Sequence, residues 1–126
     1  MNDSSVLSAW RSGDGSLSGV LAEDATFSSP VADYEGQPNA SHVLGLIAGV
    51  LEGVDQTGAW GDEREGVYAF TARVDDREVQ GIVREERAET GELTHVTLFL
   101  RPYGVLRTAI GRMREALEHS PLPARA

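Results

Sequence analysis

Residues Leu93–Leu117 decide the fold, and they read LTHVTLFLRPYGVLRTAIGRMREAL. Most of Val96–Leu100 is apolar, which predicts a strand that is covered on both faces. Because proline cannot donate a ladder hydrogen bond and sits easily at a helix start, we expect the strand to end at Arg101 and a helix to begin directly after Pro102. Apolar residues then recur at three- and four-residue spacing, which places them along one side of that helix. They are Tyr103, Leu106, Ile110, Met113 and Leu117.

The second half of the chain predicts an antiparallel meander. Four strand-like runs, at residues 55–61, 66–74, 78–88 and 92–101, are separated by short turn-rich segments. Connections this short cannot make parallel crossovers, so the strands should pair antiparallel in a strongly curved sheet.

The first third of the chain predicts two short helices before the first strand. One helix should follow Ser4 or Ser5 and break at Gly13–Gly15, and a second should run through Leu17–Leu21. A short strand is expected at 25–29, and the glycine and prolines of the irregular segment 30–38 are typical of a loop at a pocket rim.

A buried helix is expected next. From Asn39 to Val54 the apolar residues lie around much of the helical circumference. Together with the meander this predicts the α+β class. We expect one domain, residues 1–126, with a disordered tail at 119–126.

Composition excludes several classes of function. The net charge is −9 and the eleven basic residues are scattered arginines, so a nucleic-acid partner is not expected. No apolar run approaches the roughly 20 residues of a membrane helix, and Met1–Ser5 lacks signal-peptide character, which favours a cytoplasmic protein. Cysteine is absent and His42, His95 and His119 are far apart in sequence, so we expect neither a metal nor another cofactor.

Three segments together carry a family resemblance. Phe27–Val31 and Tyr34–Gly36 look like a strand-to-loop segment, and Val96–Pro102 looks like the last strand, of the SnoaL-like branch of the nuclear transport factor 2-like superfamily. The order of elements along nearly the whole chain resembles that branch as well. The superfamily includes ketosteroid isomerase, polyketide cyclases and limonene epoxide hydrolase, besides binding proteins without known chemistry, so the fold does not settle the function.

The resemblance implies a definite architecture. It implies a conical α+β half-barrel, cystatin-like in type, in which a curved sheet wraps around N-terminal helices and a C-terminal helix follows. It also implies a deep apolar pocket and a homodimer formed through the outer sheet face.

Enzymes of this superfamily usually project acids or histidines into the pocket, and this chain departs from that pattern. Related sequences often carry an acid in the penultimate strand, where this chain has Val83 at the expected inward position. Glu85 follows among Arg84, Glu86 and Arg87, and we interpret that cluster as solvent-facing ion pairs across strands.

Three residues are candidates for catalysis. His95 can exchange protons near neutral pH, but in alternation it shares a face with Phe99 and Arg101 that can be the outer, dimer-facing side. Tyr34 can donate a hydroxyl to a ligand carbonyl, and Asp33 beside it can act as a base if burial raises its pKa. Arg101 can clamp a carboxylate or phosphate at the pocket mouth, or brace a loop or a subunit contact.

The leading hypothesis is a dimeric domain that holds a small apolar organic molecule. An isomerase, cyclase or epoxide hydrolase using general acid/base chemistry is the first alternative, and a protein-interaction module with an exposed apolar sheet face is the second. Strand alternation and the resemblance together predict the pocket residues. They are Trp10, Phe27, Val31, Tyr34, Val50, Trp60, Phe70, Val83, Leu98, Leu100 and Arg101.

Overall fold

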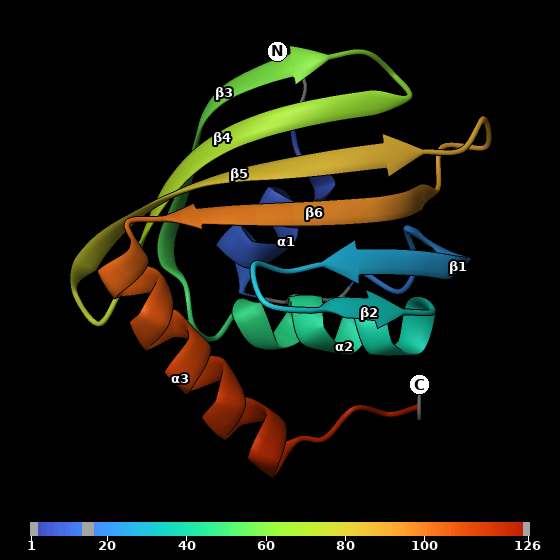
Figure 1. Cartoon of the computed structure of the whole chain (residues 1–126). Helices are drawn as coiled ribbons and strands as arrows, with labels where there is room; N and C mark the ends of the chain where they lie inside the picture. The colour runs from blue at the N-terminus through green and yellow to red at the C-terminus, as the bar shows by residue number, and fades with distance from the viewer. Residues whose placement is uncertain (1–2, 14–16, 125–126) are drawn as a thin grey trace.

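Within the described residues, 3–13 and 17–124, the computed structural model has a six-stranded sheet and three helices (Figure 1). The elements confirm the predicted α+β class. In chain order they are α1 (Ser5–Ser12), β1 (Leu21–Ser28), β2 (Asp33–Glu35), α2 (Gln37–Ile47), β3 (Glu52–Gly61), β4 (Glu65–Val74), β5 (Arg77–Arg87), β6 (Leu93–Arg101) and α3 (Tyr103–His119).

The strand order in the sheet is β2-β1-β6-β5-β4-β3. Strands β3 to β6 pair antiparallel with their neighbours, which confirms the predicted meander. On its other edge β6 pairs parallel with β1, and β1 pairs antiparallel with β2. The last long strand, β6, therefore lies between the meander and the strands from the first third of the chain.

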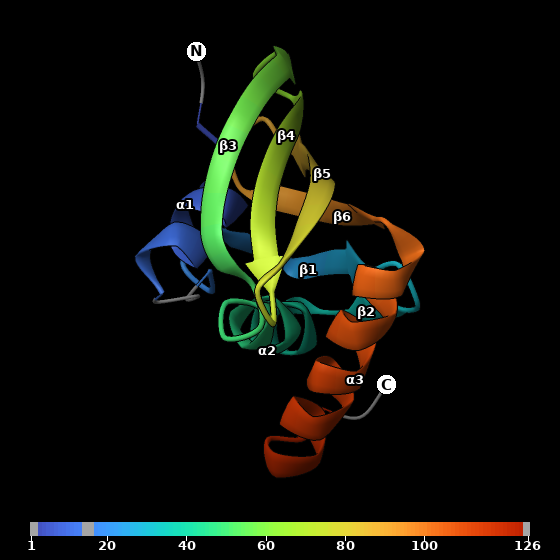
Figure 2. The same ribbon diagram turned by 90° about the vertical axis from the view of Figure 1, so that its left-hand side faces the viewer.

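The sheet bends around α1 and α2, and the core lies on its concave face (Figure 2). The Trp10 ring of α1 packs edge-on against Phe70 of β4, with ring centroids 5.9 Å apart. The Trp10 indole N–H also donates to the Leu44 carbonyl of α2, at 2.9 Å. One side chain thus joins both helices to the sheet.

Alternation along the central strands separates this inner face from an outer one. On β6 Val96 and Leu98 are buried, whereas Phe99 is 56% exposed. On β3 Trp60 is 61% exposed and pairs with Val67 of β4. We call the side that carries Phe99 and Trp60 the outer face.

Glu85 corrects one of the sequence predictions, because it lies on the inner face and is 1% exposed. Its carboxylate lies at the start of α1, where it accepts hydrogen bonds from the Ser4 hydroxyl and, at 3.1 Å, from the Val6 N–H. The Arg87 guanidinium pairs with it from the same strand, at 3.0 Å. A buried carboxylate is tolerated here because Arg87 balances its charge and both oxygens accept hydrogen bonds.

The helix α3 begins as predicted. Pro102 keeps an extended backbone, and its carbonyl accepts from the N–H groups of Val105 and Leu106. Figure 1 shows α3 leaving the end of β6 and crossing toward α2.

The first third differs from the prediction. The segment expected to restart as a helix through Leu21 enters β1 instead, because Leu21–Ser28 pairs along β6. Asp14 and Gly15 of the expected helix break lie outside the described residues, while Gly13 ends α1 with φ 76°.

The second helix also differs. The helix α2 ends at Ile47, and the residues from Glu52 to Val54, expected to be helical, begin β3. In the tail, the Ala124 N–H donates to the Asn39 side chain of α2 at 3.0 Å. Residues 125–126 are outside the described part of the chain.

Candidate functional site

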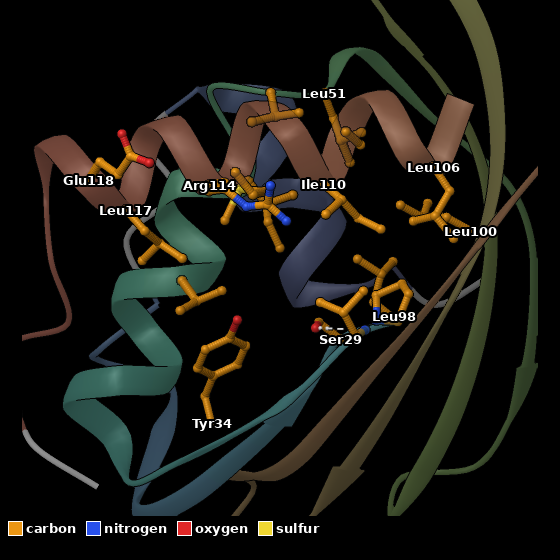
Figure 3. A pocket seen from close by; sticks show the side chains of 17 residues that line it. Ser29, Tyr34, Leu51, Leu98, Leu100, Leu106, Ile110, Arg114, Leu117 and Glu118 are labelled. Atoms are coloured by element: carbon orange, nitrogen blue, oxygen red, sulfur yellow. Dashed lines mark hydrogen bonds between the residues drawn. The ribbon is translucent and has the colours of Figure 1, made fainter. Parts of the chain in front are cut away.

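A cavity of about 510 Å³ lies between α2, β6 and α3 (Figure 3). We call it the α3 cavity. Most of its lining is aliphatic, and the polar side chains among it are those of Ser29, Tyr34, Arg114 and Glu118. The full lining is Ser29, Pro30, Val31, Tyr34, Val43, Ile47, Val50, Leu51, Leu98, Leu100, Leu106, Ala109, Ile110, Met113, Arg114, Leu117 and Glu118.

The apolar stripe of α3 forms one wall of this cavity. Leu106, Ile110, Met113 and Leu117 are half-buried and line the cavity, and Met113 and Leu117 also pack against the core. A helix that covers a sheet tightly would bury this stripe completely. The space left under α3 is therefore apolar and open to a ligand.

Five residues that we predicted to line a pocket lie around this cavity. Leu98 and Leu100 reach it from β6, and Val50 reaches it from the segment after α2. Val31 and Tyr34 line it from the loop after β1 and from β2.

The other predicted pocket residues lie elsewhere. Trp10, Phe27, Phe70 and Val83 are at most 3% exposed and fill the core, where close packing leaves no room for a ligand. Trp60 is on the outer face instead.

Arg101 is also away from the cavity. It is exposed, and its guanidinium donates to the Gln80 side chain at 2.7 Å. The alternation of β6 places Leu100 toward the cavity and therefore Arg101 away from it.

Tyr34 supplies a hydroxyl to the cavity. Its ring stacks on Phe27, with centroids 6.1 Å apart, and this contact fixes the ring orientation. Figure 3 shows the hydroxyl pointing into the cavity toward α3. Within residues 3–13 and 17–124 the Tyr34 hydroxyl has no hydrogen-bond partner.

Arg114 and Glu118 bring charge to the same cavity from α3. Both are exposed, so they lie at the rim and not in the interior. None of the ion pairs formed within the described ranges includes either side chain. Neither residue was predicted to line a pocket, although the spacing on α3 predicted the apolar stripe that they flank.

Ser29 offers little to a ligand. Its hydroxyl accepts from the N–H of Val31 at 3.2 Å and of Ala32 at 3.1 Å, and donates to the Ala32 carbonyl. The turn after β1 therefore occupies this hydroxyl.

The catalytic candidates do not assemble into one site. His95 is half-buried on the face of β6 that carries Phe99, and its two ring nitrogens contact the hydroxyls of Thr26 and, at 3.2 Å, Ser28. Asp33 is exposed on β2. Of the three candidates, Tyr34 alone lines the α3 cavity.

The described residues hold no group of three or more metal-ligating side chains. None of the helices in the described ranges is both long and apolar enough to span a bilayer.

The α3 cavity can bury the apolar surface of a ligand, donate hydrogen bonds from Tyr34 and Arg114, and accept hydrogen bonds at Glu118.

The curved sheet and its helices match the half-barrel that the resemblance to the nuclear transport factor 2-like (NTF2-like) superfamily implies. No protein-family model matches the sequence, and no curated protein matches it either. Solved structures do match.

The chain is similar to a steroid delta-isomerase from Pseudomonas aeruginosa, with 28% identity and a TM-score of 0.83 over 89% of this chain and 85% of that one. It is similar to an uncharacterised protein with a cystatin-like fold from Silicibacter pomeroyi, with 20% identity and a TM-score of 0.84 over 92% and 87% of the two chains.

A hypothetical protein with a ketosteroid isomerase-like fold from Catenulispora acidiphila, solved in complex with trimethylamine, matches at 15% identity and a TM-score of 0.62, over 86% of this chain and 94% of that one. The chain therefore has the NTF2-like fold that the sequence resemblance implies. The narrower SnoaL-like placement stays a prediction.

Proposed function

We propose that the protein binds a small, mainly apolar organic molecule in the α3 cavity. The observation that carries the proposal is the cavity of about 510 Å³ itself, lined by aliphatic side chains of α2, β6 and α3. This volume lies within the range of about 300–1,000 Å³ that is typical of small-molecule sites. An apolar lining with a few polar groups favours a ligand whose surface is mostly hydrocarbon.

Fluorescence of the neutral probe N-phenyl-1-naphthylamine tests this proposal. We expect the probe to brighten and shift to the blue with the wild-type protein, because it leaves water for an apolar site. Met113→Trp should reduce this binding at least about tenfold, because the larger side chain fills the cavity from the half-buried stripe of α3.

Arg107→Trp is the matched control. Arg107 is exposed on the same helix and outside the cavity lining, so this variant should bind the neutral probe like the wild type. Unchanged probe binding by Met113→Trp would contradict the proposed location.

A second candidate is an isomerase acting on an apolar substrate, which the 28% identity to the steroid delta-isomerase favours. In this chain the proton-transferring groups would have to be Tyr34 and Glu118, since they face the cavity and neither Asp33 nor His95 does. Isomerisation of a steroid substrate that Tyr34→Phe or Glu118→Gln abolishes would support it. Absence of turnover by a protein that binds the probe would leave binding as the function.

We also propose a homodimer that forms through the outer face. Trp60 and Phe99 are 61% and 56% exposed there, and large exposed apolar side chains are typical of protein contacts. Light scattering should give twice the chain mass for the wild type and the single chain mass for Phe99→Glu. A wild-type monomer would favour instead a surface for another protein.

A further inference from the structure

We infer that the ligand of the α3 cavity is an apolar organic acid whose carboxylate pairs with Arg114. This inference rests on the proposed function and narrows it to a chemical class. The polar groups that the cavity presents to a ligand indicate this class. Arg114 and the Tyr34 hydroxyl are both hydrogen-bond donors, and neither has a partner among residues 3–13 and 17–124.

The position of Arg114 distinguishes it from the other arginines of its helix. Arg112 pairs with Asp75 at 2.8 Å and faces the turn between β4 and β5. Arg107 is exposed and does not line the cavity. Figure 3 shows Arg114 between Leu117 and Ile110 along α3, at the rim of the cavity. Arg114 is therefore the cationic side chain that a ligand in the α3 cavity can contact.

The chemistry of guanidinium selects the ligand group. Guanidinium is donor-only, stays charged at neutral pH, and binds carboxylates with two parallel hydrogen bonds. The Tyr34 hydroxyl points into the cavity from the opposite side and offers a further donor. A ligand that satisfies these groups needs an acceptor head, and the aliphatic lining requires a hydrocarbon body.

The Glu118 carboxylate and the net negative charge of the chain both oppose the binding of an anion, and both effects are weak. Glu118 lines the rim one turn beyond Arg114, and Figure 3 shows its carboxylate apart from the guanidinium. The net charge of −9 repels anions at long range, but salt at physiological strength screens exposed charges beyond about 8 Å. A direct contact with Arg114 is within that distance and outweighs both.

Competition between two ligands of equal chain length tests the inference. Octanoate and octan-1-ol have the same number of carbons and differ in the head group, and each is titrated against bound N-phenyl-1-naphthylamine at pH 7. We expect octanoate to displace the probe from the wild type at about a tenfold lower concentration than octan-1-ol, as a charge-assisted hydrogen bond allows.

Variants of two arginines on α3 assign the preference to one of them. Arg114→Gln should reverse the preference, because without the guanidinium a carboxylate loses more by leaving water than a hydroxyl does. Arg114→Lys should keep part of it, and Arg107→Gln, which removes the same charge from an exposed position, should keep all of it. Arg114 is exposed and unpaired within the described ranges, so its variants should fold like the wild type.

The outcomes separate this inference from the proposed function. Equal displacement by both ligands, or a preference for octanoate that persists in Arg114→Gln, would overturn the inference while probe binding still supported an apolar site. A wild-type protein that does not bind the probe at all would overturn both.

Discussion

Replacing Glu85 by glutamine should destabilise the fold strongly, although the side chain keeps its size. The Glu85 carboxylate is buried at the start of α1, where the Ser4 hydroxyl, the Val6 N–H and the Arg87 guanidinium all donate to it. Glutamine removes the negative charge and turns one oxygen into a donor. At least one of those three donors then faces an NH₂ group in the core.

The magnitude follows from these contacts. Breaking a buried pair on one side costs about 3–5 kcal/mol, but the Arg87 side chain is 23% exposed and regains some water. We therefore expect a loss of about 2–3 kcal/mol in the free energy of unfolding. For a chain of 126 residues this lowers the midpoint of thermal unfolding by about 10 °C.

Urea and thermal unfolding followed by circular dichroism measure this loss. Glu86→Gln is the matched control, because Glu86 is the neighbouring residue and its ion pair with Arg84 is partly exposed and 3.7 Å long. That variant should change the free energy of unfolding by less than about 0.5 kcal/mol. A Glu85→Gln protein as stable as the control would refute the view that this carboxylate anchors α1.

Two glycine substitutions and one tyrosine test other contacts. Gly81→Ala should destabilise by about 1–3 kcal/mol in urea unfolding, because its new methyl group would clash with the Phe70 ring. Gly111→Ala on α3 should instead stabilise by about 1 kcal/mol, since nothing lies within 4 Å of that methyl group. Burial raises the pKa of the Tyr68 hydroxyl above its ordinary value of 10.0, so the unfolded state ionises first. Stability should therefore fall as the pH rises above about 10, and Tyr68→Phe should lessen that fall in urea unfolding at pH 9 to 11.

The meander and α3 could be predicted because the patterns that indicate them lie within each element's own short stretch of sequence. Alternation fixed the four long strands to within a few residues, and Pro102 marked the change from strand to helix. The strand β1 could not be predicted in this way. Leu17, Val20 and Leu21 have helical spacing, but Leu21–Ser28 gains a strand partner in β6, about seventy residues later in the chain, and tertiary pairing outweighs a local pattern.

Glu85 was placed on the wrong face although the sequence held the signal for the right one. Val79, Gly81 and Val83 lie on the inner face, and strict alternation continues that face to Glu85. The three charged neighbours of Glu85 suggested a solvated cluster instead. The helix start that engages its carboxylate comes from Ser4, about eighty residues away, and no local pattern reveals that contact.

The candidate site was predicted only in part for a similar reason. Leu98 and Leu100 could be placed on one face by alternation, and both line the α3 cavity. The helical stripe at Leu106 and Ile110 was predicted as well, but its spacing equally describes a helix packed tightly on a sheet. The distance between α3 and α2 depends on side-chain packing, which the sequence pattern does not give. That Arg114 lines the cavity could therefore be seen only in the structure.

Methyl chemical shifts during a titration with octanoate locate the ligand site in the fold. With leucine, valine and isoleucine methyl groups labelled, we expect shifts that saturate together at Leu98, Leu106 and Leu117 of the cavity. The methyl signals of Leu7, a buried residue of α1, should not shift. Shifts confined instead to Ile82 and the rest of the outer face, or no saturable shifts at all, would contradict a ligand site between α2, β6 and α3.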